Sequence, residues 1–228
     1  MSVTEHSLMV IEHATTSDLR RRIGLGLLLA ALILCGVALA LCNGPNGYHS
    51  GFHSVQSLTA AIPGLVWMTL SLIGDEKFLV TALAIACVRR PELISPSLVA
   101  AVAAVLVTHG MKLEIDALRP AATLDWSSFE ALGPRLFLNS FPSGHTLAAF
   151  AAATMLFRCI PNPLLRATLM LVAFGVSLSR VAVGVHWPVD ALVGASLGIC
   201  IGAAAPTLAW QARLIARNSQ RFFWSRVR

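Results

Sequence analysis

Long apolar stretches follow one another along the chain and are separated by short polar segments. The first, residues 23–41, has 19 residues, and as a helix it would rise about 28 Å, close to the thickness of a hydrocarbon core. It is longer than the apolar region of a cleaved signal peptide, which favours an uncleaved anchor. The pattern predicts six membrane-spanning helices, at residues 23–41, 74–88, 94–113, 145–158, 164–183 and 188–210.

Residues 58–73 are apolar enough to compete for a seventh crossing, but the charge pattern argues against it. Six crossings from a cytoplasmic N-terminus place 12 of the 17 Lys and Arg residues on the inner side. A crossing at 58–73 would place Arg89 and Arg90 on the outer side, or else reverse the sides of the loops that follow. Either result would weaken the excess of positive charge on the inner side. We therefore expect a re-entrant or interfacial helix on the outer face, broken at Pro63 and Gly64.

Composition agrees with an all-α polytopic membrane protein of six transmembrane helices plus this extra helix. Of the 228 residues, 56% are hydrophobic and 12% are charged, and the mean hydropathy is +0.73. We expect three parts: a cytoplasmic N-terminal tail at 1–22, a six-helix membrane domain at 23–210 and a basic cytoplasmic tail at 211–228. The net charge of +6 follows from the inner-side bias and suits anionic lipid, so no nucleic-acid partner is expected. The five cysteines show no paired spacing and imply no disulfide or metal framework.

Five cations are expected on the outer side, and three of them differ from Lys77 and Arg135, which fit ordinary loop or interface charges. Lys112 and Arg119 lie seven residues apart at the outer end of the third span, and Arg180 lies near the outer end of the fifth. Each alone could balance a helix dipole and extend to water. Three together, next to the histidines described below, favour an anion site.

The fourth and sixth spans both begin at the outer face, with "PSGH" and "HWPVD". A helix N-terminus presents unpaired N–H groups, so it binds anions readily. Gly144 would let the backbone approach a ligand, Ser143 would cap the helix or donate to the ligand, and His145 lies in the first turn. Alone, this motif could equally be a helix cap with a solvated histidine.

In the second motif, Asp190 follows His186 by four residues, within reach of its ring on a helix. A carboxylate that holds one imidazole nitrogen leaves the other free as a nucleophile. Gly194, Gly198 and Gly202 continue at steps of four, and this stripe of small residues favours close packing inside the bundle over a dimer contact.

This combination predicts phosphoryl transfer through a covalent histidine intermediate. Three cations would neutralise the phosphate oxygens, His186 would attack phosphorus, and His145 would protonate the departing oxygen. No cluster of carboxylates is present to hold a metal. Short outer loops place the phosphate at the membrane surface, which indicates a phosphorylated lipid as the substrate.

At these residues the chain resembles the type 2 phosphatidic acid phosphatase superfamily. Three signatures occur in order: Lys112-x6-Arg119-Pro120, Pro142-Ser143-Gly144-His145, and Ser179-Arg180-x5-His186-x3-Asp190. The resemblance implies a six-helix fold without metal or other cofactor. It implies phosphate binding by Lys112, Arg119, Ser143, Gly144 and Arg180, with His145 as the acid, His186 as the nucleophile and Asp190 as its partner. Many members have a second Arg-Pro where this chain has Ala121-Ala122, a departure that bears on substrate fit.

The expected protein is a multi-pass enzyme of the bacterial inner membrane, with both termini in the cytoplasm and the active site facing the periplasm. Undecaprenyl diphosphate is the first choice of substrate. Alternatives are phosphatidylglycerol phosphate, phosphatidic acid or the phosphates of lipid A, or a phosphotransferase that uses a polyprenyl diphosphate donor. A non-enzymatic anion transporter is a more distant alternative, because spans four to six carry few ionisable residues below the outer rim.

Two further expectations concern polar and aromatic side chains near the membrane surface. Trp67, Trp126 and Trp187 fit an interfacial aromatic belt, and Trp126 and Trp187 could instead line the entrance for the lipid. His109, one turn before Lys112, fits a hydrogen-bonded interior residue or a support for the site.

Overall fold

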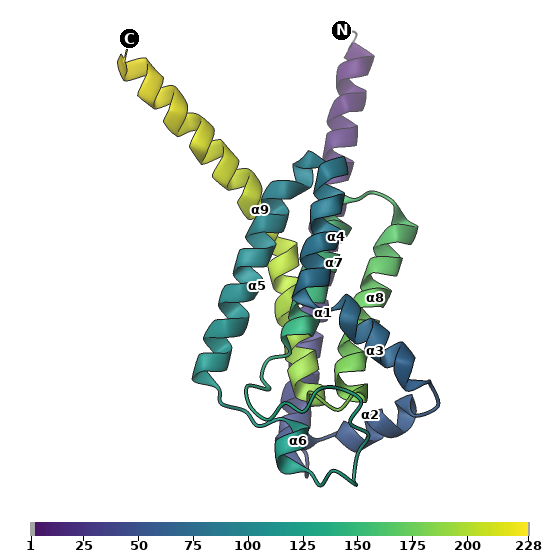
Figure 1. Ribbon diagram of the computed structural model, residues 1–228. Coiled ribbons are helices and arrows are strands. Elements are labelled where there is room, and N and C mark those ends of the chain that lie inside the picture. The colour runs from purple at the N-terminus through teal and green to yellow at the C-terminus, as the bar shows by residue number, and fades with distance from the viewer. Residues whose placement is uncertain (1–2, 228) are drawn as a thin grey trace.

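Helices make up the regular structure of the computed structural model, which describes the backbone of residues 3–227 and the side chains of residues 22–216 (Figure 1). No strand occurs among residues 3–227, so the predicted all-α class is confirmed. The elements are α1 (Val3–Cys42), η1 (Gly47–His49), α2 (Phe52–Thr59), α3 (Gly64–Ile73), α4 (Glu76–Arg89), η2 (Pro91–Leu93), α5 (Ile94–Glu114), α6 (Pro120–Thr123), α7 (Gly144–Cys159), α8 (Pro163–Ala182) and α9 (Pro188–Val227).

Four of these helices are long and apolar enough to cross a membrane, within the part of the chain described. They are Arg22–Cys42 of α1, Pro91–Glu114 across η2 and α5, Pro163–Ala182 of α8 and Pro188–Ala216 of α9. The other two predicted spans correspond to α4 and α7, which have only 14 and 16 residues. Each of the six predicted spans thus coincides with a helix, while the number of crossings stays a prediction.

Helix α7 forms the centre of the bundle and packs against α9, α8 and α5. Its contact with α9 is close because glycines of α9 face the α7 backbone. A Cβ atom added to Gly198 would lie 2.5 Å from the carbonyl oxygen of Leu147, and one at Gly202 would lie 2.5 Å from that of Ala151. The prediction that the glycine stripe packs inside the bundle is confirmed.

The break expected at Pro63 and Gly64 occurs, but the predicted start at residue 58 is wrong, because the first of the two helices begins at Phe52 and residues 60–63 are not helical. Helix α2 ends at Thr59, and α3 begins at Gly64 after Pro63, which lacks the N–H to continue a helix. The indole Nε1 of Trp67 donates to the Thr59 carbonyl oxygen at 3.1 Å and ties α3 back to α2. Helix α3 then packs against α8 and α4. Its position relative to a membrane, re-entrant or interfacial, stays a prediction.

The two ends of the bundle differ in structure (Figure 1). One end, here called the loop end, is formed by the segments 43–63 and 115–143, which include the short helices α2 and α6. At the other, here called the terminal end, α1 and α9 extend toward the two chain termini. Within the predicted tails at 1–22 and 211–228, helix α1 extends back to Val3 and α9 extends to Val227. The side chains of 1–21 and 217–228 lie outside the described residues.

Candidate active site

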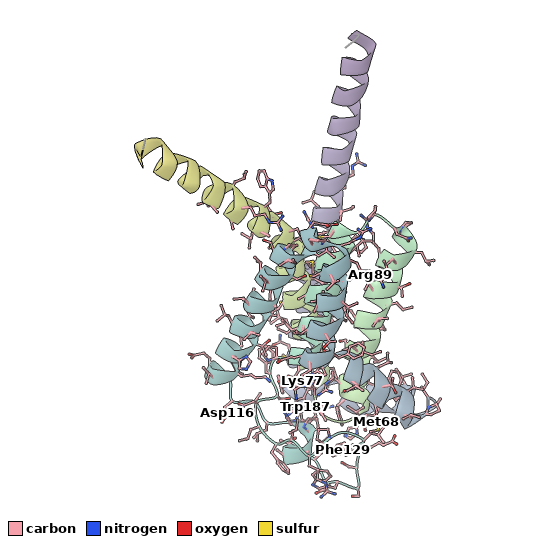
Figure 2. The ribbon with its side chains drawn as sticks, turned by 45° about the horizontal axis from the view of Figure 1, so that its top comes forward. Met68, Lys77, Arg89, Asp116, Phe129 and Trp187 are labelled. Carbon is pink, nitrogen blue, oxygen red and sulfur yellow. The ribbon has the colours of Figure 1, made fainter. Side chains whose placement is uncertain are left out.

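Residues that are distant in sequence meet at the loop end of the bundle. Lys112 comes from the last turn of α5, Arg180 from the last turn of α8 and His145 from the first turn of α7. Arg119 precedes α6, and His186 lies two residues before α9. Trp187, the neighbour of His186, lies with Phe129 at the loop end, and Arg89 lies at the terminal end (Figure 2).

The Asp190 carboxylate anchors the site and is fully buried. Its Oδ2 accepts from the Trp187 N–H at 2.9 Å, from the Ser140 hydroxyl at 2.5 Å and from His186 Nδ1 at 3.2 Å. Its Oδ1 accepts from the Tyr48 hydroxyl. Because a buried carboxylate without donors would be costly, these four hydrogen bonds offset the cost of burying the Asp190 side chain.

Both neighbours of the His186 ring favour the same tautomer. Asp190 accepts at Nδ1, so this nitrogen carries the proton. A guanidinium nitrogen, Nη1 of Arg119, lies 3.3 Å from Nε2 and can only donate, so Nε2 keeps its lone pair. Burial lowers the pKa of His186 to about 4, against the opposing effect of its hydrogen bond to Asp190 and of that charge. The ring is therefore neutral near pH 7, with Nε2 as the unprotonated nitrogen.

Arg119 is held by backbone carbonyl oxygens. Its guanidinium donates to Leu138 at 2.8 Å, to Val185 at 3.0 Å and to Asn139 at 3.1 Å. The segment before α6 pairs with the segment before α7, since Arg119 N–H donates to the Phe137 carbonyl oxygen at 2.9 Å. Burial lowers the pKa of Arg119, with the charge of Asp190 opposing, but a guanidinium remains charged at any working pH. These bonds fix one cation beside His186.

Two further cations complete an electropositive site. Arg180 is 6% exposed, its Nη1 donates to the Ser71 hydroxyl of α3, and its buried Nε has no hydrogen-bond partner among the described residues. Lys112 is half-buried and lies within electrostatic range of Arg119, Arg180 and Asp190. An unpartnered buried donor next to clustered cations is the arrangement that an anion would satisfy.

His145 faces the same group of charges. It is half-buried, lies within electrostatic range of Arg180, His186 and Lys112, and its Nε2 lies 3.8 Å from Oδ2 of Asp75. Asp75 also caps α4 by accepting from the Lys77 N–H at 2.9 Å. The two histidines therefore belong to one site, and each has a carboxylate partner.

The "PSGH" motif is packed tightly at the start of α7. Ser143 is fully buried, its N–H donates to the Asp190 carbonyl oxygen at 3.1 Å, and its Oγ accepts from the Thr146 hydroxyl at 3.0 Å. A Cβ on Gly144 would lie 3.2 Å from Cγ2 of Thr108, tighter than usual packing. These contacts join the N-termini of α7 and α9, which the sequence expected to face one anion.

Some surrounding residues differ from expectation. Trp187 is fully buried, stacks on the His49 ring at 4.1 Å and donates from Nε1 to the Leu118 carbonyl oxygen, and Trp67 is only 6% exposed. An aromatic belt is therefore wrong for both, because each fills space between elements. The interior position expected for His109 is also wrong: it is exposed, and its Nδ1 lies 3.0 Å from the Val105 carbonyl oxygen of its own helix.

Three contacting residues were missed by the sequence reasoning: Tyr48, Ser140 and Asp75. Tyr48 is the only tyrosine of the chain and lies 142 residues before Asp190. No periodic pattern or spacing marks loop residues of this kind. Asp75 alone carried a local signal, because an aspartate just before a helix is a typical N-cap.

Sequence comparison matches the chain to a known family. A family model described as the PAP2 superfamily matches residues 94–214, just over half of the chain. An Escherichia coli (strain K12) protein with the provisional name undecaprenyl-diphosphatase YbjG is 39% identical over 74 residues, which are 32% of this chain and 36% of that protein. Lipid A 1-phosphatase of Porphyromonas gingivalis is 41% identical over 66 residues, which are 28% of this chain and 15% of that protein. The match thus spans well under half the length of either relative.

Solved structures share the fold. LpxE from Aquifex aeolicus superposes with a TM-score of 0.62 at 28% identity, over 68% of this chain and 91% of that one. A transmembrane PAP2-type phosphatidylglycerolphosphate phosphatase from Bacillus subtilis superposes with a TM-score of 0.63 at 21% identity, over 82% and 96% of the two chains. The matched family segment contains every one of the predicted site residues, and the chain belongs to the PAP2 superfamily.

Proposed function

We propose that the protein is an integral-membrane lipid phosphatase that hydrolyses a lipid phosphate or diphosphate through a phosphohistidine. One observation carries the proposal: the buried His186 ring is held by Asp190 so that its unprotonated Nε2 lies beside Arg119. A neutral nitrogen nucleophile next to fixed cations suits attack on a phosphoryl group.

The reaction divides into two displacements. Nε2 of His186 forms a bond to phosphorus as the bond to the lipid oxygen breaks, while Lys112, Arg119 and Arg180 balance the charge on the phosphoryl oxygens. His145 donates a proton to the lipid oxygen. A water molecule then gives its proton to His145 and attacks phosphorus, so the P–N bond breaks and inorganic phosphate leaves.

The protonation of His145 depends on the substrate in this mechanism. Arg180 and Lys112 place positive charge near its ring, and its Nε2 lies 3.8 Å from a carboxylate oxygen of Asp75. A bound phosphate would offset the cations. The acid is therefore formed when the anion is present, which limits loss of the proton to water in the empty site.

The proposed substrate is a phosphorylated lipid in the periplasmic leaflet of a bacterial inner membrane, with undecaprenyl diphosphate as the first choice. The name of the E. coli relative supports it. The names of the P. gingivalis and B. subtilis proteins support lipid A or phosphatidylglycerol phosphate as alternatives. A phosphotransferase that uses a polyprenyl diphosphate donor would share the first displacement and differ only in the acceptor.

Phosphate release from these lipids by the purified full chain, with and without EDTA, tests the proposal. We expect release from at least one lipid, unaffected by EDTA and inhibited by vanadate, which can adopt the geometry of the transferring group.

His186→Ala should abolish release, and rapid quenching of the unaltered protein should trap phosphate on His186. Normal turnover by His186→Ala, or a strict need for added divalent metal, would contradict the mechanism.

A further inference from the structure

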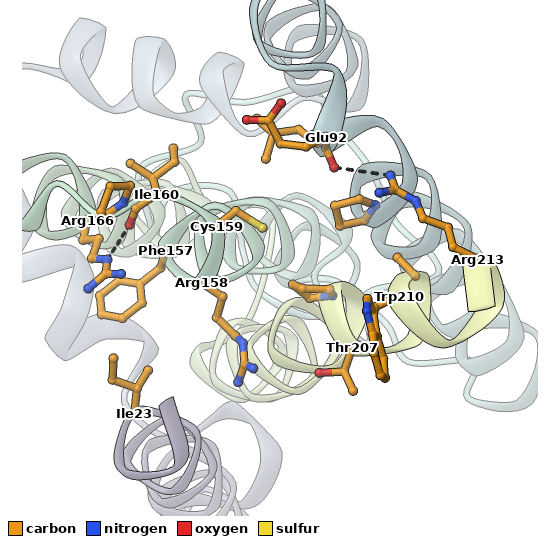
Figure 3. A pocket seen from close by; sticks show the side chains of 15 residues that line it. Ile23, Glu92, Phe157, Arg158, Cys159, Ile160, Arg166, Thr207, Trp210 and Arg213 are labelled. Carbon is orange, nitrogen blue, oxygen red and sulfur yellow. Dashed lines mark hydrogen bonds between the residues drawn. The ribbon is translucent and has the colours of Figure 1, made fainter. Parts of the chain in front are cut away.

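A second group of cations lies around a cavity of about 950 Å³ (Figure 3), and none of the candidate active-site residues lines it. Its walls are the last turn of α7, the first turns of α8 and α5, and parts of α1 and α9, which contribute Ile23 and Trp210. The active site instead uses the first turn of α7 and the last turns of α8 and α5. The cavity therefore belongs to the terminal end of the bundle.

Three arginines and one glutamate carry the charge of this cavity: Arg158, Arg166, Arg213 and Glu92. Arg166 donates from Nε to the Ile160 carbonyl oxygen at 2.6 Å, and its guanidinium lies 5.0 Å from the centre of the Phe157 ring. Among the described residues, the one hydrogen bond of the Arg213 side chain is to the Glu92 carbonyl oxygen, at a long 3.5 Å.

None of the three guanidinium groups pairs with a carboxylate within residues 22–216. Arg158 has no hydrogen-bond partner there at all, and its Nη1 would lie 3.6 Å from a Cβ added to Gly24 of α1. With three arginines and one glutamate, the cavity carries net positive charge. Most N–H groups of the three guanidinium groups remain available to bind a ligand. Such groups bind phosphate oxygens through paired N–H bonds.

The remaining lining is suited to a lipid more than to a free anion. Phe157, Ile160, Pro206 and Trp210 line the same cavity. The apolar segment of α1 begins at Arg22, and that of α9 ends at Ala216. The cavity therefore lies near the ends of these segments, at the depth where a lipid headgroup meets its acyl chains. Trp210 is 61% exposed, as an indole at such a boundary would be.

We propose that this cavity binds the phosphodiester headgroup of an anionic phospholipid and so joins α1, α7, α8 and α9 at the terminal end. With the orientation proposed above, this lipid belongs to the cytoplasmic leaflet, opposite the substrate. Basic cavities between membrane helices on the cytoplasmic side are suited to anionic headgroups. Binding itself depends neither on catalysis nor on the identity of the substrate.

Native mass spectrometry of the full chain in detergent tests the proposal, with phosphatidylglycerol as the probe and vanadate present to occupy the active site. The test variant is Arg158→Gln with Arg166→Gln. Its control is Arg89→Gln with Arg90→Gln, which removes the same charge at the same end from exposed residues outside the cavity. We expect affinity to fall at least about tenfold in the test variant, as loss of charge-assisted hydrogen bonds implies, and to be unchanged in the control.

Several results would overturn the proposal. Equal losses of phosphatidylglycerol affinity in the test and control variants would mean that the lipid is attracted by surface charge in general and not by this cavity. Equal binding of phosphatidylcholine with the same chains, or full displacement by inorganic phosphate, would mean that no anionic lipid is selected. If the double variant does not fold, Arg158→Gln alone serves, because this side chain makes no recorded hydrogen bond within the described part. Unchanged phosphatidylglycerol affinity in that variant would also contradict the site.

Discussion

At the scale of single residues, Tyr48 has the least expected role. Burial raises the pKa of its phenol far above the ordinary value, and the nearby charge of Asp190 raises it further. The hydroxyl therefore stays protonated and donates to Asp190 over any practical pH range. In the proposed mechanism Tyr48 acts through Asp190, which orients the nucleophile His186, so Tyr48 would be a positioning residue.

Tyr48→Phe should lower kcat about tenfold with little change in KM, since one hydrogen bond to a charged group is worth about 1.5 kcal/mol. Ser140→Ala removes another donor to the same carboxylate and should act in the same direction. Steady-state kinetics on one lipid phosphate, with thermal unfolding to confirm folding, measures both. An unchanged kcat in Tyr48→Phe would show that three donors suffice to hold Asp190.

The pH dependence of the reaction follows from the burial of His186. Its pKa is lowered to about 4, so the ring loses its proton at lower pH and the nucleophile is present above about pH 4. The acidic limb of kcat/KM should therefore lie well below 6.5, the ordinary imidazole value. Two substrates whose phosphates ionise differently separate this limb from the titration of the substrate. A limb near 6.5 on both would contradict a buried, neutral His186.

The role of His145 can be tested by the leaving group. If His145 donates the proton, His145→Ala should lose much more activity on a lipid substrate with a poor leaving group than on one with a good leaving group. Asp75→Asn should show the same pattern more weakly, because its carboxylate lies 3.8 Å from His145 Nε2. Equal losses of kcat/KM on the two substrates would make His145 a phosphate-binding residue instead.

At the scale of helices, the contact between α7 and α9 is the one most sensitive to side-chain size. Gly198→Ala would place its Cβ 2.5 Å from a backbone oxygen and 2.7 Å from Phe150 Cβ, so the helices must separate. We expect a loss of about 1–3 kcal/mol in the free energy of unfolding, seen as a lower thermal midpoint in detergent. Gly36→Ala in α1 is the control, because nothing lies within 4 Å of the added atom. Similar midpoints for both variants would refute the close packing.

Hydropathy located the helices better than it determined how many of them cross the membrane. The predicted span 164–183 agrees closely with α8 (Pro163–Ala182). The polar residue Asn162, which precedes the apolar stretch, also caps this helix by accepting from the Leu165 N–H, so the apolar stretch and the helix begin at nearly the same residue. Helices α4 and α7 are shorter, and hydropathy does not show whether neighbouring helices cover their ends. The fixed spacings within the three signatures identified Lys112, Arg119, Arg180 and His186, which lie at or near helix ends. Tyr48 in the short helix η1 and Ser140 in a loop belong to no such spacing.

At the scale of the whole molecule, the two ends of the bundle carry different groups, with the candidate active site at the loop end and the second group of arginines at the terminal end. The proposed orientation puts the active site in the periplasm and both termini in the cytoplasm. A fluorescent protein fused to the C-terminus should therefore fold and fluoresce, while alkaline phosphatase fused there should be inactive. Alkaline phosphatase inserted in the 126–134 loop should be active in the same cells. The reverse pattern of activities would invert the orientation.

The four donors to Asp190 also set the time at which the protein can first work. Tyr48, Ser140 and the His186–Trp187 pair come from three separated parts of the chain, and the carboxylate that joins them follows all of them. During synthesis, an inserted chain that lacks α9 has no partner for His186. Under the proposed mechanism, protein in the membrane that lacks α9 would hold no oriented nucleophile, so activity would begin only once α9 is in place.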